Sequence, residues 1–167
     1  SVRGAWRYAG GMGDTLSTLV DEAATRAPES IAIRIDDDEL TYADFHRQVV
    51  RAAGALAGHG VGPASRVGLS AGNSVEFAVA VFATLRLGAT AVMISTSWRD
   101  NEVAHAIGLT DPTHFVHDGS GATDLGTATA RPVLRVADLA GDEPHDTAPA
   151  TVDPDDVAVM VFSSGTT

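Results

Sequence analysis

Five small polar residues near the end of the sequence are the strongest candidates for chemistry. Ser163, Ser164, Gly165, Thr166 and Thr167 follow directly on an apolar run over 157–162. An apolar run with no polar face is typical of a fully buried strand, and open α/β folds bind ligands at the carboxyl ends of such strands. Hydroxyl groups and unhindered turn amides can cradle an anion, so phosphate is the expected ligand. Taken alone, however, such a run is more often an ordinary loop.

The segments that must position these residues alternate between strands and helices. Apolar periodicity predicts helices over 16–27, 41–60, 73–87 and 99–108. It predicts strands over 31–35, 39–42, 66–71, 90–94, 113–116, 133–136 and 157–162. Such alternation favours right-handed crossovers and a mainly parallel sheet with helices on both faces. We therefore predict a layered α/β fold with a short β-hairpin near the N-terminus, and exposed loops over 118–130 and 137–154.

Capping patterns define the starts of three of these helices. Thr41 with Asp44, and Asn73 with Glu76, have the three-residue spacing of an N-cap and its partner. Asp100 is the expected cap of the helix over 99–108. At the first helix, Asp14 or Thr15 can fill the same role.

The composition fits one compact domain or one piece cut from a larger protein. The sequence has 167 residues, of which 44% are hydrophobic and 20% charged, so it can build a core. Residues 1–13 carry a glycine-rich stretch and are expected to be a flexible N-terminus. Residues 14–167 are expected to form one α/β subdomain.

The basic residues exclude several kinds of chemistry. All 11 are arginine, and the sequence contains neither lysine nor cysteine. It therefore supplies no disulfide, no thiolate nucleophile, no cysteine metal site, no Schiff-base lysine and no phosphate-binding lysine. The formal net charge of −11 disfavours binding to nucleic acid or to an anionic membrane, because phosphates would be repelled. A small anion can still bind locally.

Neither a membrane span nor a secretory signal is visible in the sequence. No stretch is long and apolar enough to cross a bilayer, and residues 1–13 lack the apolar segment of a signal peptide. The expected location is the cytoplasm.

Other polar residues receive structural interpretations. His114 and His117 are three apart in a predicted strand and should point to opposite faces, which disfavours a metal pair. The aspartates over 36–38 and 153–156 lack the spacing of a calcium loop and fit turns and caps. Trp98 can contact a ligand, but packing over the following helix is the favoured interpretation. We therefore predict no metal site and no catalytic residue within these 167 residues.

A series of short motifs resembles the N-terminal part of adenylate-forming enzymes, a family of acyl- and aryl-CoA ligases, peptide-synthetase adenylation domains and luciferases. The resemblance extends over 16–167, in the family's order. Its main elements are LTYADF over 40–45, GVGP over 60–63, NSVEF over 73–77 and DDVAVMVFSSGTT over 155–167. The last element resembles the start of the family's phosphate loop, which normally continues through Gly to a Pro-Lys pair. The subdomain over 14–167 would then be truncated within that loop.

The resemblance implies a two-step reaction with ATP, Mg²⁺ and coenzyme A. A carboxylic acid attacks the α-phosphate of Mg-ATP to give an acyl adenylate, and a thiol, usually that of coenzyme A, then takes the acyl group. Residues 163–167 would form the ATP phosphate site, with Ser164, Gly165, Thr166 and Thr167 contacting the β- and γ-phosphates. The family's adenine, magnesium and carboxylate segments, and its C-terminal domain with a catalytic lysine, lie beyond Thr167. The chain alone is therefore predicted to be inactive, with the rest of the same enzyme as its partner.

One departure from the family pattern bears on the subfamily. Relatives often carry an Asn-Pro or Asp-Pro turn where this sequence has Ser-Thr-Ser-Trp-Arg over 95–99. The missing Asp-Pro form favours a fatty-acid or other acyl-CoA ligase over a peptide-synthetase adenylation domain. Two alternatives stay open: a non-catalytic nucleotide-binding or interaction module that acts alone, and a longer protein nicked by protease at an exposed loop.

Overall fold

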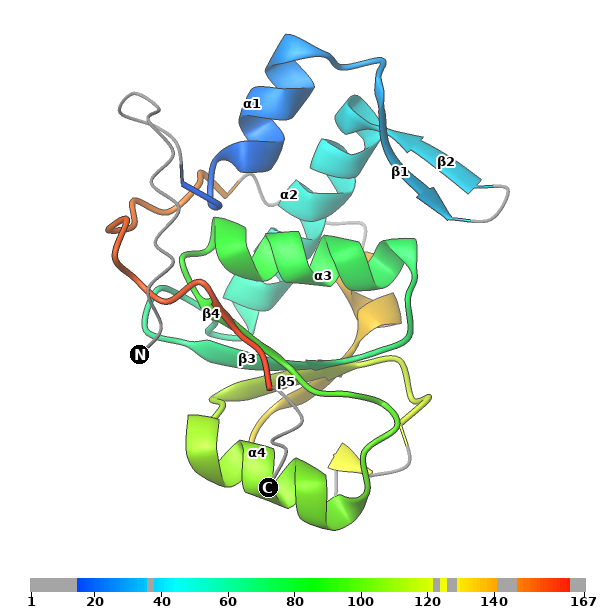
Figure 1. Cartoon of the computed structure of the whole chain (residues 1–167). Coiled ribbons are helices and arrows are strands. Elements are labelled where there is room, and N and C mark those ends of the chain that lie inside the picture. The colour runs from blue at the N-terminus through cyan, green and yellow to red at the C-terminus, as the bar shows by residue number, and fades with distance from the viewer. Residues whose placement is uncertain (1–14, 36–37, 122–123, 126–128, 141–146, 163–167) are drawn as a thin grey trace, which may run out of the picture.

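A parallel sheet lies at the centre of the fold, between layers of helices (Figure 1). The computed structural model describes residues 15–35, 38–121, 124–125, 129–140 and 147–162. Within these ranges the sheet has five strands in the order β6-β5-β3-β4-β7, and each neighbouring pair is parallel. The strands are β3 (Arg66–Ser70), β4 (Thr90–Met93), β5 (His114–His117), β6 (Val133–Arg135) and β7 (Val159–Met160). The predicted α/β fold is confirmed.

Helices cover both faces of the sheet. In Figure 1, α2 (Tyr42–Gly58) and α3 (Val75–Arg86) lie above it, and α4 (Asp100–Thr110) lies below it. The helix α1 (Leu19–Arg26) packs on α2. The antiparallel hairpin of β1 (Ile31–Ile35) and β2 (Asp38–Thr41) stands to one side, and a 3₁₀ turn, η1 (Val136–Ala140), follows β6. The predicted hairpin is therefore also confirmed.

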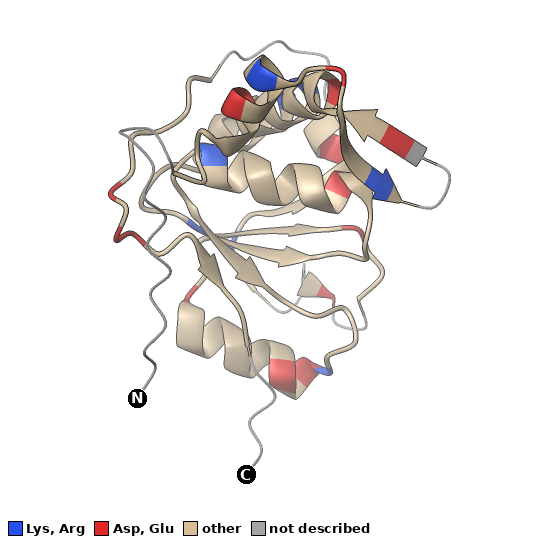
Figure 2. Ribbon diagram, turned by 45° about the horizontal axis from the view of Figure 1, so that its top comes forward, with Lys and Arg blue, Asp and Glu red and all other residues tan. Residues whose placement is uncertain are grey.

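Two apolar clusters hold these layers together. The larger one joins α2 and α3 to the upper face of the sheet through Phe45, Val49, Leu56, Val67 and Leu69. The smaller one joins the lower face to α4; its buried members are Val92, Ile94, Val103, Phe115 and Leu125. Charge is absent from the middle of α3, whose charged residues stand only at its two ends (Figure 2). Burial of these apolar faces against the sheet is the main stabilising term.

The helix starts show one confirmed cap and two corrections. The Thr41 hydroxyl accepts a hydrogen bond from the Asp44 backbone N–H at 3.2 Å, as predicted. At α3 the cap is Ser74 and not Asn73, since the Ser74 Oγ accepts from the Phe77 N–H at 3.1 Å. At α4 the cap position is Arg99 and not Asp100, and the Arg99 N–H donates to the Glu102 carboxylate at 2.9 Å. Adjacent polar residues compete for a cap, so sequence alone can miss it by one position.

The prediction that residues 157–162 form a fully buried strand is wrong. Only Val159–Met160 are assigned as strand, and β4 is the one neighbour of β7 in the described part of the chain. Val157, Val159 and Val161 are 56%, 37% and 74% exposed. The alternate residues Met160 and Phe162 pack against the lower cluster. One face of this edge strand is therefore solvated, although its residues are apolar.

Two further expectations need correction. Leu16 and Leu19 lie on the predicted apolar face of the first helix, yet both are exposed. The loops after β5 and β6 were expected to be exposed, yet Leu125 and Leu139 are buried. Each of these two leucines anchors its loop to an apolar cluster.

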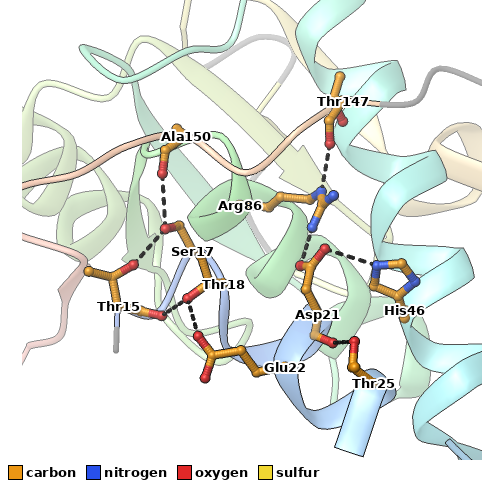
Figure 3. Close-up of polar contacts among 10 residues, drawn as sticks. All are labelled: Thr15, Ser17, Thr18, Asp21, Glu22, Thr25, His46, Arg86, Thr147 and Ala150. Atoms are coloured by element: carbon orange, nitrogen blue, oxygen red, sulfur yellow. Dashed lines mark hydrogen bonds and ion pairs between the residues drawn. The ribbon is translucent and has the colours of Figure 1, made fainter. Parts of the chain in front are cut away.

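A partly buried polar network fixes α1 to the rest of the molecule (Figure 3). The Arg86 guanidinium, whose side chain is 4% exposed, forms an ion pair with Asp21 of α1. Its Nε donates to the Thr147 carbonyl at 2.9 Å. Asp21 also contacts the His46 Nε2 of α2 at 3.1 Å. Three helices and the segment at Thr147 thus meet at one charged pair.

A close approach by a buried aromatic ring constrains Gly68 of β3. A Cβ on Gly68 would lie 2.7 Å from the Phe115 Cδ1 and 3.1 Å from the Ile94 Cδ1. Because the Phe115 ring is fully buried, Gly68→Ala is expected to lower the free energy of unfolding by about 1–3 kcal/mol.

Urea unfolding measures this cost, and Gly108→Ala is the matched control. A Cβ on Gly108 of α4 has no such neighbour within 4 Å. That change should raise stability by about 0.5–1 kcal/mol, because alanine favours the helix. Equal effects of the two changes would contradict the packing at Gly68.

Candidate functional site

A groove opens at the carboxyl ends of three adjacent strands. It has a volume of about 520 Å³. The loop at 71–73, which follows β3, forms one wall. The loop with Ser95, Thr96 and Trp98, which follows β4, forms the second wall. Val161 and Phe162, which follow β7, also line the groove. Phe77 of α3 and Met93 of β4 also line the groove.

The topology of the sheet explains why the groove lies there. The chain leaves β3 toward α3 on one face of the sheet, whereas it leaves β4 toward α4 on the other face (Figure 1). The two connections diverge and leave a crevice between the strand ends. Open α/β sheets bind their ligands at such a switch point.

Apolar and hydroxyl side chains share the lining of the groove. Trp98 and Phe162 meet edge to face, with ring centroids 5.2 Å apart and an interplanar angle of 79°. Trp98 also packs against the lower apolar cluster. The favoured interpretation of Trp98 as a packing residue is confirmed, and the same side chain lines the groove. The Ser95 hydroxyl, which lines the groove, is 2.8 Å from the Ser97 hydroxyl.

The predicted phosphate residues follow the last residue of the groove lining in the sequence. Ser163, Ser164, Gly165, Thr166 and Thr167 lie outside the described residues, so their role stays a prediction. Phe162, the residue before them, is part of the groove lining. The lining residues Phe77, Met93 and Phe162 were not predicted as site residues, although their places at strand and helix ends could have indicated them.

A carboxylate outside the lining holds one groove wall. Asp118, just after β5, accepts a hydrogen bond from the Gly72 N–H at 2.8 Å and another from the Ser120 N–H at 2.7 Å. Burial raises the pKa of Asp118, but the hydrogen bonds from Ser120 and Gly72 outweigh burial and bring the pKa below its ordinary value. Asp118 therefore stays ionised at neutral pH. Sequence analysis did not single it out.

The remaining candidates have structural partners. Thr113 and the His59 carbonyl bind the two ring nitrogens of the buried His114, at 2.9 and 3.0 Å. Asp156 accepts from the Asp153 N–H within their turn. In the described ranges, no three His, Cys, Asp or Glu side chains lie close enough together to hold a metal ion. None of the helices that the structure describes is long and apolar enough to cross a bilayer.

Comparison with known proteins agrees with the fold. A family model described as AMP-binding enzyme matches residues 20–167. The chain belongs to this family of adenylate-forming enzymes. The match begins in α1 and runs through the sheet to the end of the sequence, so it includes both walls of the groove and the predicted phosphate residues. The family assignment made from the motif series is confirmed.

Relatives fall into more than one branch of the family. The chain is 32% identical to a medium/long-chain-fatty-acid–CoA ligase of Mycobacterium tuberculosis, over 92% of the chain and 28% of that protein. It is also 32% identical to triostin synthetase I of Streptomyces triostinicus, over 99% of the chain and 33% of that protein. The O-succinylbenzoate coenzyme A synthetase of Bacillus subtilis, solved with AMP, has the same fold, with a TM-score of 0.80 at 23% identity over 89% of the chain and 39% of that structure. The chain thus spans about a third of these proteins.

Proposed function

We propose that the chain is the N-terminal part of an enzyme that activates a carboxylic acid with ATP and transfers the acyl group to coenzyme A. One observation carries the proposal. Phe162 is part of the lining of the groove at the switch point of the sheet, and the hydroxyl- and glycine-rich residues 163–167 follow it directly in the sequence. The match of the AMP-binding family to residues 20–167 supports it.

In the first step, a carboxylate oxygen of the acid attacks the α-phosphorus of ATP. The bond from that phosphorus to the bridging oxygen breaks, and pyrophosphate leaves with the electron pair. The leaving group gathers negative charge, so fixed donors in the 163–167 segment would stabilise it without reorganising. Ser164, Thr166 and Thr167 would supply hydroxyls, and Gly165 an unhindered N–H.

In the second step, the thiolate of coenzyme A attacks the acyl carbon. The thiol proton passes to solvent before the attack, the bond from that carbon to the phosphate oxygen breaks, and AMP leaves. The groove lining includes the apolar side chains of Phe77, Met93, Trp98 and Phe162. These side chains suit the uncharged part of a substrate better than a further charged group.

Mg²⁺ is the cation that accompanies ATP. Magnesium prefers carboxylate and water oxygens. The described lining contains no Asp or Glu side chain. These residues therefore fit the nucleotide phosphates through hydroxyl and amide donors, and Mg²⁺ would arrive bound to ATP.

The acceptor of the acyl group, coenzyme A or a carrier protein, distinguishes this proposal from a peptide-synthetase fragment. Equal identity to a CoA ligase and to triostin synthetase I does not separate the two branches. The sequence Ser-Thr-Ser-Trp-Arg over 95–99, which replaces the Asp-Pro turn and forms one groove wall, favours the CoA ligase.

Product analysis tests the proposal. The complete protein that contains this chain is incubated with ATP, coenzyme A and a panel of aliphatic and aromatic acids, and AMP and acyl-CoA are measured by mass spectrometry. Equal amounts of AMP and one acyl-CoA are expected. AMP without acyl-CoA would favour a carrier-protein acceptor. Binding of ATP without AMP formation would favour a non-catalytic module and overturn the proposal.

A further inference from the structure

We propose that Asp118 is a positioning residue that fixes the groove wall at 71–73 and orients the turn that lies behind the second wall. The proposal rests on the proposed function, because it assigns the groove to the substrates. Asp118 does not line the groove and is not a catalytic residue. It lies in the turn at 118–121, on the loop after β5.

The bond from Asp118 to Gly72 joins two loops that are 46 residues apart. Gly72 belongs to the wall at 71–73 that follows β3. β3 and β5 are already paired up to Ser70 and His117. The carboxylate therefore joins the two loops beyond the last paired residues, where β3 and β5 no longer pair. Its target is the backbone of the wall, so it restrains the wall's position.

The same turn also supports the second wall. Gly121 lies close to Thr96, since a Cβ on Gly121 would be 3.9 Å from the Thr96 Cα and 3.5 Å from the Ser70 Oγ. Leu125, further along this loop, is buried in the cluster against which Trp98 packs. Gly121, Thr96 and Trp98 together border a space of only about 10 Å³. The loop after β5 thus contacts both walls from behind.

An ionised carboxylate suits this position because it uses both oxygens as acceptors. Oδ2 accepts from Gly72 and Oδ1 from Ser120. The second bond orients the side chain toward the first. The Arg135 guanidinium donates to the Asp118 carbonyl at 3.2 Å and holds the backbone of the turn. An asparagine could accept only one of the two bonds, because its amide nitrogen is a donor.

Hydrogen exchange tests the contact without any reference to activity. In the 167-residue chain, Asp118→Ala should raise the exchange rate of the Gly72 amide at least tenfold, whereas the amides of β3 keep their protection. Asp118→Asn should give an intermediate rate. The control is Asp111→Ala, which removes an exposed carboxylate that pairs with Arg66 and Arg131 away from the groove. An unchanged Gly72 amide in Asp118→Ala would overturn the proposal.

Steady-state kinetics of the complete protein tests the consequence for the substrates. Asp118→Ala should raise the KM for the acid or for ATP about tenfold and change kcat less than threefold, because a displaced wall weakens binding more than chemistry. Asp118→Asn should restore part of the loss, and Asp111→Ala should leave both constants unchanged. Unchanged KM, or a loss confined to kcat, would overturn the positioning role. An inactive wild-type protein would instead overturn the proposed function, and the exchange measurement would still decide whether Asp118 holds the wall.

Discussion

Replacing Asp21 by asparagine is expected to lower the free energy of unfolding by about 3 kcal/mol. The change leaves the Arg86 guanidinium, which is almost completely buried, without its counter-charge. Asparagine keeps the size of the side chain and can still accept a hydrogen bond. The substitution therefore removes the charge together with one of the two acceptor oxygens that contact Arg86 and His46. Urea unfolding followed by circular dichroism measures the change.

The location of this ion pair is the physical reason for the large effect. Arg86 lies at the end of α3, and the bond to the Thr147 carbonyl satisfies Nε without neutralising the charge. Burial of a cation costs desolvation free energy, and without a counter-charge no electrostatic attraction offsets that cost. The ion pair also joins α1 to α3, so its loss should release α1 before the sheet unfolds.

Two control variants separate charge from packing. Glu39→Gln breaks the Arg34–Glu39 pair, whose side chains are 65% and 47% exposed, and should cost at most about 1 kcal/mol. The double variant Asp21→Leu with Arg86→Met removes both charges and should recover most of the stability lost in Asp21→Asn. A loss in Asp21→Asn no greater than that in Glu39→Gln would contradict the buried pair.

Replacing Thr166 by alanine is expected to lower the kcat of ATP–pyrophosphate exchange about 100-fold in the complete protein. The reason is the proposed role of the Thr166 hydroxyl as a fixed donor to the departing pyrophosphate. Because that charge develops in the transition state, the KM for the acid should change little. Exchange kinetics with saturating acid measures the effect.

The control for this change is Thr151→Ala, in the exposed segment before β7. It removes a threonine hydroxyl that does not line the groove, and it should leave kcat unchanged. A kcat in Thr166→Ala within threefold of the wild-type value would contradict a phosphate-binding role for Thr166, even if the enzyme activates a carboxylate.

Local signals in the sequence were sufficient for most of the fold. Thr41 with Asp44 predicted the start of α2, and the alternation of apolar runs predicted the sheet and the hairpin. These features depend on residues close together along the chain. The cap at Ser74 was missed by one position because Asn73 has the same capping chemistry.

Long-range features could not be predicted in the same way. The apolar composition of 157–162 gives no indication that β7 lies at an edge of the described sheet, because strand order depends on crossovers. Asp21 and Arg86 are 65 residues apart, and Asp118 and Gly72 are 46 apart, so no local pattern connects them. The carboxyl ends of predicted strands did indicate the place of the site, but its aromatic lining combines Phe77, Trp98 and Phe162, which are distant from one another in the sequence.

Incorporation of labelled pyrophosphate into ATP by the complete protein decides whether it activates a carboxylic acid. The proposed function predicts incorporation that depends on one class of acid, needs no coenzyme A, and is absent from the 167-residue chain alone. Exchange requires reversible formation of an acyl adenylate, so it reports the first step without the second. No incorporation with any aliphatic or aromatic acid, or incorporation that does not depend on acid, would contradict the proposed function.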